Sequence, residues 1–315
     1  MYSPTRLAGY AVLLLTPGAL LARGLLATGL SAPVAGLEVG LLLTGGVAVV
    51  AEREHALEAP GSYEPEREDL LDALAVVVAA VVTYVLSVRA GLGPVVGSAL
   101  VGLLAGVFAT EIAVPAYCGS FVGMASPTLF PSVGHLALAG LLSGVAFVAA
   151  ERAFAGFGGK LGTLALFGCA TTAVVTDATY AAAGPFRWTS AALVVPVAVV
   201  GAVGAVVLSV RLDMGAVVGS ALVGLLAGLV LPAVPFWPGE TLAAAAFCAS
   251  FVGMSSTDRL GGEGRVALAG AVCGLVFVAV AAAFAGAGGK LGTIAFVSCV
   301  TTSGAETALS RTLRA

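Results

Sequence analysis

Long apolar segments constrain the fold of this chain more than any other feature. Stretches of about 17 to 22 apolar residues recur, which is the length that an α-helix needs to cross a bilayer. Hydrophobic residues make up 59% of the chain and charged residues 10%, whereas soluble domains carry about 25% charged residues. Because backbone polar groups in lipid must be paired internally, and the segments lack the alternation of barrel strands, helices are expected.

The sequence therefore predicts an all-α integral membrane protein with about ten to twelve transmembrane helices. Residues 1–30 resemble a signal peptide at first sight, but Pro17 and Arg23 interrupt the apolar run and further spans follow directly. We interpret this region as a first transmembrane helix. Clear spans are expected at residues 7–29, 34–51, 70–88, 93–109 and 133–153.

Two parts of the chain, residues 70–177 and 190–306, resemble each other. Residues 136–163 and 266–293 share 18 identities in 28 positions. The period, about 120–130 residues, is too long for a solenoid, and paired related halves are a common way to build a transporter. We predict a tandem internal duplication. The expected domains are an N-terminal transmembrane hairpin at 1–52, an acidic polar loop at 53–69, and membrane repeats at 70–177 and 190–306.

The number of spans in each repeat decides how the halves are related, because an odd number inverts them and an even number leaves them parallel. The doubtful pieces are 112–128 and 241–256, which are short for a full crossing and can instead be broken or re-entrant. Five spans per repeat place nine arginines inside and three outside, whereas four place eight inside and four outside. The positive-inside rule thus favours inverted halves, with both termini in the cytoplasm and the protein in the cell membrane.

The only two lysines in the chain, Lys160 and Lys290, occupy matched places in the sequence Gly-Gly-Lys-Leu-Gly-Thr. A lysine at membrane depth costs roughly 2.5–3.5 kcal/mol unless it reaches the interface or lines a polar cavity. The preceding glycines, Gly159 and Gly289 among them, permit a sharp turn into a helix. The positive helix end and the ammonium group then suit an anion. Two alternatives stay open: a lysine that marks a turn and extends to the headgroups, and a role in proton relay or gating.

A second repeated motif, Cys-x-Ser-Phe-Val-Gly-Met-x-Ser, places Ser120 and Ser250 inside apolar surroundings. Small and hydroxyl residues let helices approach closely and form hydrogen bonds across the contact. The alternative is a discontinuous helix that lines a path with hydroxyl and freed carbonyl groups. The cysteines of this motif are expected to be packing residues, since no histidine lies near them.

Signatures of an enzyme, a metal site or a cofactor site do not occur in the sequence. The two histidines, His55 and His135, lie in separate polar stretches, and there is no His-Glu-x-x-His motif and no nucleotide-binding loop. The net charge is −3 and no basic patch occurs, so no nucleic-acid partner is expected. The five cysteines form no disulfide framework.

These features predict a transporter or channel with a translocation site between the two repeats, for a small anion or anionic solute. The expected partners are the lipid bilayer and a small solute or ion. Whether the chain also forms a homo-oligomer stays open. The alternative is a non-transporting scaffold or an accessory subunit of a membrane complex. The expected substrate-binding residues are Lys160, Lys290, Gly159, Gly289, Thr163, Thr293, Ser120 and Ser250.

Overall fold

The structure is a computed structural model, and it describes residues 3–28, 32–57, 66–182, 187–235 and 238–313. Every regular element in these ranges is helical, which confirms the predicted all-α class. The α-helices are α1 (Pro4–Thr28), α2 (Ala32–Leu57), α3 (Arg67–Tyr84), α4 (Gly93–Phe108), α5 (Ala113–Val122), α6 (Val133–Ala149), α7 (Lys160–Val175), α8 (Ala191–Val206), α9 (Ala216–Val230), α10 (Gly239–Ser250), α11 (Glu263–Ala279) and α12 (Lys290–Thr312). The short turns are η1 (Val85–Arg89), η2 (Thr110–Ile112), η3 (Trp188–Ser190), η4 (Val207–Arg211), η5 (Leu231–Ala233) and η6 (Val252–Met254).

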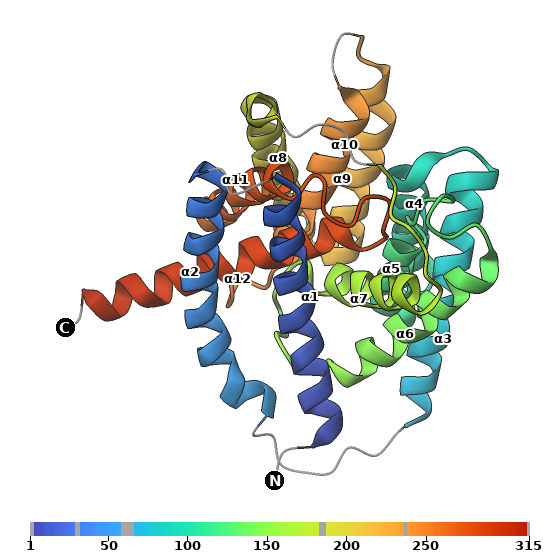
Figure 1. Cartoon of the computed structure of the whole chain (residues 1–315), viewed down its shortest axis with the longest axis horizontal. Coiled ribbons are helices and arrows are strands. Elements are labelled where there is room, and N and C mark those ends of the chain that lie inside the picture. The colour runs from blue at the N-terminus through green and yellow to red at the C-terminus, as the bar shows by residue number, and fades with distance from the viewer. Residues whose placement is uncertain (1–2, 29–31, 58–65, 183–186, 236–237, 314–315) are drawn as a thin grey trace.

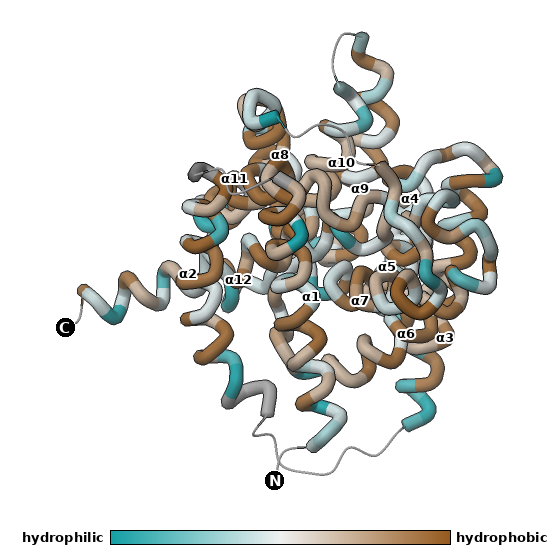
Figure 2. Tube along the Cα trace, viewed as in Figure 1, coloured by the Kyte–Doolittle hydropathy of each residue, from teal (hydrophilic) through white to brown (hydrophobic). Residues whose placement is uncertain are grey.

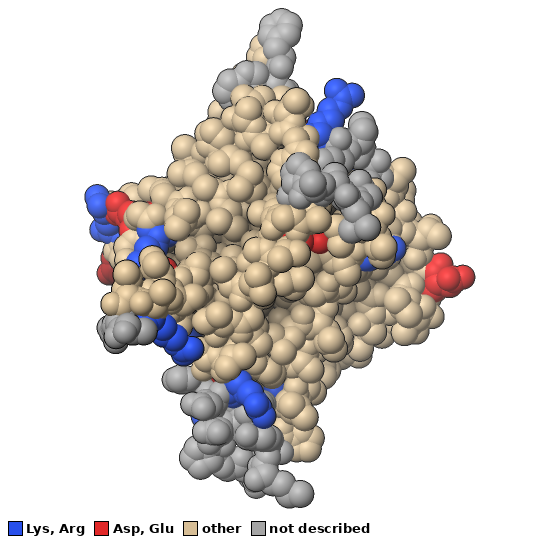
Figure 3. All heavy atoms as spheres, turned by 60° about the vertical axis from the view of Figure 1, so that its left-hand side comes forward, with Lys and Arg blue, Asp and Glu red and all other residues tan. Residues whose placement is uncertain are grey.

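Within the described ranges, five helical segments are long and apolar enough to cross a membrane, so the chain has the character of a multi-pass membrane protein. Hydrophobic residues follow most of the helices, and hydrophilic ones gather near several helix ends (Figure 2). The face turned forward in Figure 3 consists mainly of uncharged side chains. The five segments are Pro4–Ala27, Val34–Arg53, Arg67–Arg89, Trp188–Arg211 and Ala216–Ala233.

The two doubtful pieces of the sequence do not form continuous helices of full length. In the piece 112–128, α5 has 10 residues, about 15 Å at 1.5 Å per residue, roughly half of a bilayer core. In the piece 241–256, α10 ends at Ser250 and the 3-10 turn η6 follows. Helices α4, α6 and α7 are also apolar but shorter than 18 residues, so the helices of full length in the described residues are fewer than the predicted spans.

The predicted polar loop at 53–69 is shorter than expected on both sides. Helix α2 continues to Leu57, and α3 begins at Arg67 with Glu66 as its N-cap. The side chain of Asp69 accepts a hydrogen bond from the Glu66 backbone N–H at 2.9 Å, which completes a capping box. Residues 58–65 of the predicted loop lie outside the described residues.

Similar sequence gives similar local structure in residues 67–175, here called the first half, and 188–312, here called the second half. The shared pentapeptide Val-Leu-Ser-Val-Arg is π-helical in both, as η1 and η4. Helices α4 and α9, which share the Val-Gly-Ser-Ala-Leu sequence, pack against each other. A Cβ at Gly106 would lie 2.6 Å from Val218, and one at Gly228 would lie 2.7 Å from Val96, so these two helices run antiparallel.

The first turns of α7 and α12 cross at backbone contact in the middle of the molecule. A Cβ added at Gly162 would lie 2.4 Å from the Cα of Gly292. A Cβ added at Gly159 would clash with the backbone nitrogen of Phe296, and one added at Gly289 would clash with that of Leu166, so the crossing is also antiparallel. Gly159 and Gly289 begin the two helices with φ of 81° and 82°, a conformation that favours glycine.

The N-terminal hairpin of α1 and α2 packs along the outside of this crossing. Helix α12 runs across the molecule, and its C-terminal end extends past α2 (Figure 1). At their contact, a Cβ on Gly304 would lie 1.9 Å from the Thr44 carbonyl oxygen. At the other side of the hairpin, Gly9 of α1 lies so close to the Ala149 carbonyl oxygen that a Cβ added at Gly9 would clash with it. The hairpin thus contacts both halves.

The close contact of α7 and α12 at Gly162 and Gly292 predicts that a single added methyl group destabilises the protein. Gly162→Ala and Gly292→Ala should each lower the free energy of unfolding in detergent by about 1–3 kcal/mol, because the added Cβ meets a rigid backbone. Gly40→Ala is the matched control, since it is also a helical glycine but has nothing within 4 Å of its Cβ position. Equal thermal midpoints for all three variants would contradict the proposed role of the crossing.

Candidate functional site

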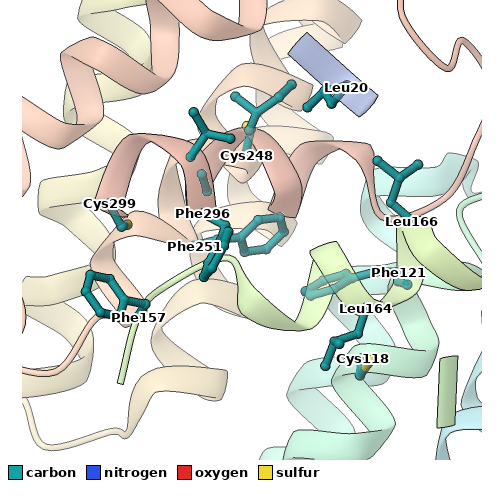
Figure 4. Packing of buried hydrophobic residues seen from close by; sticks show 14 of the residues in the cluster. Leu20, Cys118, Phe121, Phe157, Leu164, Leu166, Cys248, Phe251, Phe296 and Cys299 are labelled. Atoms are coloured by element: carbon teal, nitrogen blue, oxygen red, sulfur yellow. The ribbon is translucent and has the colours of Figure 1, made fainter. Parts of the chain in front are cut away.

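The repeated lysine and serine motifs meet at the centre of the molecule. The rings of Phe121 and Phe251, one from each serine motif, lie 4.6 Å apart between centroids (Figure 4). The Gly158 N–H donates a hydrogen bond of 3.0 Å to Ser255 Oγ, and Gly288 packs against the Phe121 carbonyl oxygen. Each Gly-Gly-Lys turn therefore packs against the serine motif of the other half.

The lysine side chains bind the carbonyl ends of neighbouring helices. Lys160 Nζ donates to the carbonyl oxygens of Ala150 at 2.7 Å and Glu151 at 2.8 Å, just after α6. Lys290 Nζ donates to the Ala281 carbonyl oxygen at 2.6 Å, just after α11. A cation at a helix C-terminus satisfies orphan carbonyls and complements the negative end of the dipole. An ammonium group has three donors, so these contacts leave one N–H on Lys160 and two on Lys290.

The threonine and serine hydroxyls predicted at the site are buried and bonded within the protein. Thr163 Oγ1 donates to the Gly159 carbonyl oxygen at 3.3 Å, and Thr293 Oγ1 donates to the Gly289 carbonyl oxygen at 3.2 Å. Both bonds follow the i to i−4 pattern of helical hydroxyls. These two side chains therefore stabilise the turns that carry the lysines, and neither faces the solvent.

Ser120 and Ser250 join helices through a short hydroxyl chain. Ser120 Oγ donates to the Tyr117 carbonyl oxygen at 2.7 Å and lies 2.9 Å from Ser98 Oγ. Because a hydroxyl has a single proton to donate, Ser98 donates to Ser120. In the second half, Ser250 likewise bonds its own helix, and Ser220 Oγ bonds Ser250 at 2.8 Å.

The Tyr117 hydroxyl extends this chain from one half to the other, because it lies 3.0 Å from Ser220 Oγ. Since the Ser220 proton goes to Ser250, Tyr117 is the donor. The second half has Phe247 at the position that matches Tyr117, so it has no equivalent hydroxyl group there to bond the first half. The sequence motif indicated the serines, but an isolated tyrosine gave no signal of a partner 103 residues away.

A cavity of about 320 Å³ opens beside Lys160 and lies between the two halves. Its wall is mainly apolar and includes the Phe121 and Phe251 rings, while Lys160 and Glu151 are its charged side chains. Helix α7 begins at this wall, so the positive end of its dipole lies beside the cavity. The lining residues are Val114, Phe121, Phe147, Glu151, Ala155, Gly156, Phe157, Gly158, Gly159, Lys160, Leu161, Ala216, Val217, Phe251 and Met254.

A buried ion pair ties the hairpin to the loops near this cavity. Glu52 of α2 is 3% exposed, and its carboxylate oxygens accept two hydrogen bonds from Arg259, at 2.8 and 3.1 Å. The Phe154 backbone N–H donates to the same carboxylate at 3.1 Å, and Arg259 Nε donates to the Ala155 carbonyl oxygen. The Arg259 guanidinium also lies 4.7 Å from the centroid of the Phe157 ring.

Sequence reasoning missed this pair because its members are 207 residues apart and Glu52 stands at the edge of the predicted hairpin. One signal was present. The position of the first half that matches Arg259 is Leu129, so the second half has a charged residue where the first half has an apolar one.

The matching loop of the second half is contacted by an arginine from α1. The Arg23 guanidinium lies 4.6 Å from the centroid of the Tyr180 ring and 5.0 Å from that of the Phe284 ring. Burial raises the pKa of the Tyr180 hydroxyl, while the positive charge of Arg23 lowers it. Phe284 and its counterpart Phe154 both have positive φ, 48° and 53°, so each half holds a strained aromatic residue where the hairpin docks.

Within the described residues, no cluster of three or more His, Cys, Asp or Glu side chains is placed to hold a metal ion. The five cysteines are buried and unbridged. Comparison with protein-family models, with curated proteins and with solved structures gave no match. The function therefore has to be inferred from the architecture and the site.

The Glu52–Arg259 pair can be tested by a double-mutant cycle with Glu52→Gln and Arg259→Leu. We expect a coupling free energy of about 1–3 kcal/mol, because Arg259→Leu leaves the buried Glu52 carboxylate without its cation. The exposed pair Arg211–Glu263 is the matched control and should give less than about 1 kcal/mol. Equal coupling in the two cycles, measured by thermal unfolding in detergent, would show that Glu52–Arg259 is an ordinary surface pair.

Proposed function

We propose that this protein is a membrane transporter or channel that moves a small anionic solute through the cavity beside Lys160. The observation that carries the proposal is the cavity itself, because it lies where the lysine motif of one half meets the serine motif of the other. Sites between related halves, next to helix starts, are typical of transporters.

The charges around the cavity favour an anion. The Lys160 ammonium keeps one free N–H, and the first turn of α7 contributes the positive end of its dipole. Glu151 also lines the cavity, so these two contributions have to outweigh one carboxylate. The mainly apolar wall strengthens the interaction of the ammonium with a solute, because charges attract more strongly where water is excluded.

We further propose that the two halves are inverted relative to each other and that the chain crosses the membrane twelve times. Neighbouring equivalent helices run antiparallel in both close contacts, α4 with α9 and α7 with α12, which supports an axis in the membrane plane. In this arrangement α5 and α10 are interrupted crossings, and both termini face the cytoplasm of the cell membrane.

A specific observation favours a second candidate, a non-transporting scaffold. Both ammonium groups bind helix carbonyls, and the hydroxyls of Thr163, Thr293, Ser120 and Ser250 are satisfied inside the protein. In a scaffold, these groups would hold the helices together and bind no solute. The two candidates differ in whether a solute enters the cavity.

Covalent block of the cavity distinguishes transporter from scaffold. Ala216 is exposed and lines the cavity, so Ala216→Cys should react with a water-soluble methanethiosulfonate, while the native cysteines are buried. We expect anion flux into proteoliposomes to fall about tenfold or more after modification, since the adduct occupies the space of the solute. Ala90→Cys, exposed and outside the cavity lining, is the control and should keep its flux. Undiminished flux in modified Ala216→Cys would remove the cavity from the path.

The lysines are tested with chloride, phosphate and small carboxylates as solutes. The Lys160→Met/Lys290→Met variant should lose most of the flux, because no ammonium then offsets Glu151 in the cavity. Its thermal midpoint must be measured beside it, since the carbonyls after α6 and α11 also lose their donors. A variant that is folded but transports normally would make the lysines helix caps alone. No flux from the native protein would support the scaffold.

A further inference from the structure

Helix α2 carries a second buried carboxyl group, Glu38, at the opposite end from Glu52. Glu38 is 4% exposed, and its Oε1 is buried without a hydrogen-bond partner in the part of the chain that the structure describes. It lies about one turn inside the candidate span Val34–Arg53. Gly24 of α1 packs against it, with Oε1 3.4 Å from the Cβ position of that glycine.

The surroundings of Glu38 offer no cation to an ionised carboxylate. On α1 the nearest charged residue in sequence to Gly24 is Arg23, whose guanidinium is placed over the Tyr180 and Phe284 rings. On α12, Lys290 binds the Ala281 carbonyl oxygen and Glu306 pairs with Arg265. The segment after α11, from Val280 to Ala287, contributes no titratable side chain.

Glu38 and Glu52, the two carboxyl groups of α2 described as buried, therefore form a pair for comparison. Glu52 is equally buried, but it accepts two hydrogen bonds from Arg259 and one from a backbone N–H. Glu38 is buried, but its Oε1 accepts no hydrogen bond from the described residues. A buried ionised carboxylate without a partner is costly enough that the group takes up a proton instead. An ionisable residue of this kind within a membrane span marks a functional site more often than a packing site.

We infer that Glu38 is a proton-binding site within the membrane, occupied by a proton at neutral pH. Proton release from Glu38 creates a carboxylate beside Gly24, the residue that follows Arg23 in α1, and the attraction draws the Arg23 guanidinium away from the Tyr180 and Phe284 rings. Since Tyr180 lies in the loop after α7 and Phe284 lies between α11 and α12, loss of the proton loosens the hairpin from these two loops. The inference does not depend on transport, because it rests on α1 and α2 and not on the cavity.

The experiment compares the two carboxyls in the full-length protein, reconstituted in lipid at neutral pH, with the hydrophobic reagent dicyclohexylcarbodiimide. This reagent reacts with protonated carboxyl groups. Adducts are located by mass spectrometry of the digested protein. We expect Glu38 to be modified about tenfold or more faster than Glu52, because burial without a partner favours the neutral form of Glu38, whereas the Glu52 oxygens are held in hydrogen bonds with Arg259 and Phe154. Glu38→Gln should remove this adduct and leave the thermal midpoint nearly unchanged.

A second measurement covers the case in which the reagent does not reach Glu38. The infrared C=O band of a protonated carboxyl should be present in the native protein and decrease in Glu38→Gln, and Glu52→Gln should leave it unchanged. A band that is unaffected by Glu38→Gln would overturn the inference, whatever the labelling shows. Equal or faster modification of Glu52 would also overturn it.

Discussion

The backbone contact between the first turns of α7 and α12 is the constraint on which the rest of the architecture depends. Two helices approach this closely only where neither has a side chain, and Gly162 and Gly292 meet there. The contact brings two positive helix ends together in a region with few compensating charges. The lysines at these ends turn outward to the carbonyls after α6 and α11, so their charge is placed at negative helix ends. The glycine turns and the lysines therefore work as one unit in each half.

The hairpin stabilises this unit from outside by different means on its two sides. At one end of α2, Glu52 binds Arg259 of the second half and the Phe154 N–H of the first half. At the other end, Arg23 lies over the Tyr180 and Phe284 rings, and Glu38 is buried without a hydrogen-bond partner at Oε1 among the described residues. A chain built from two similar halves would be nearly symmetric, but the hairpin contacts them unequally. The hairpin thus forms an ion pair at one end and cation–π contacts at the other.

Local features of this structure followed from the sequence because they depend on neighbouring residues. The predicted span 93–109 matches α4, Gly93–Phe108, and the Gly-Gly-Lys segments do begin helices. Helix α5 is shorter than hydropathy implies, because Gly123 ends it before Pro127, and hydropathy does not detect such an end. The partners of the lysines, of Tyr117 and of Glu52 lie on other elements, so no local pattern reveals them. Glu38 differs from these residues, because an acidic residue within a long apolar run is itself a sequence signal of a functional site in the membrane.

The central claim is that the two halves are related by an antiparallel crossing and thus have opposite orientations in the membrane. The most direct measurement is the sidedness of two exposed, matched positions, Thr128 and Asp258, each replaced singly by cysteine and labelled in intact cells with an impermeant maleimide. The native cysteines are buried, so they give little background. The account predicts that one of the two cysteines reacts from outside and that the other reacts only after the membrane is permeabilised. Reaction of both from the same side would contradict it.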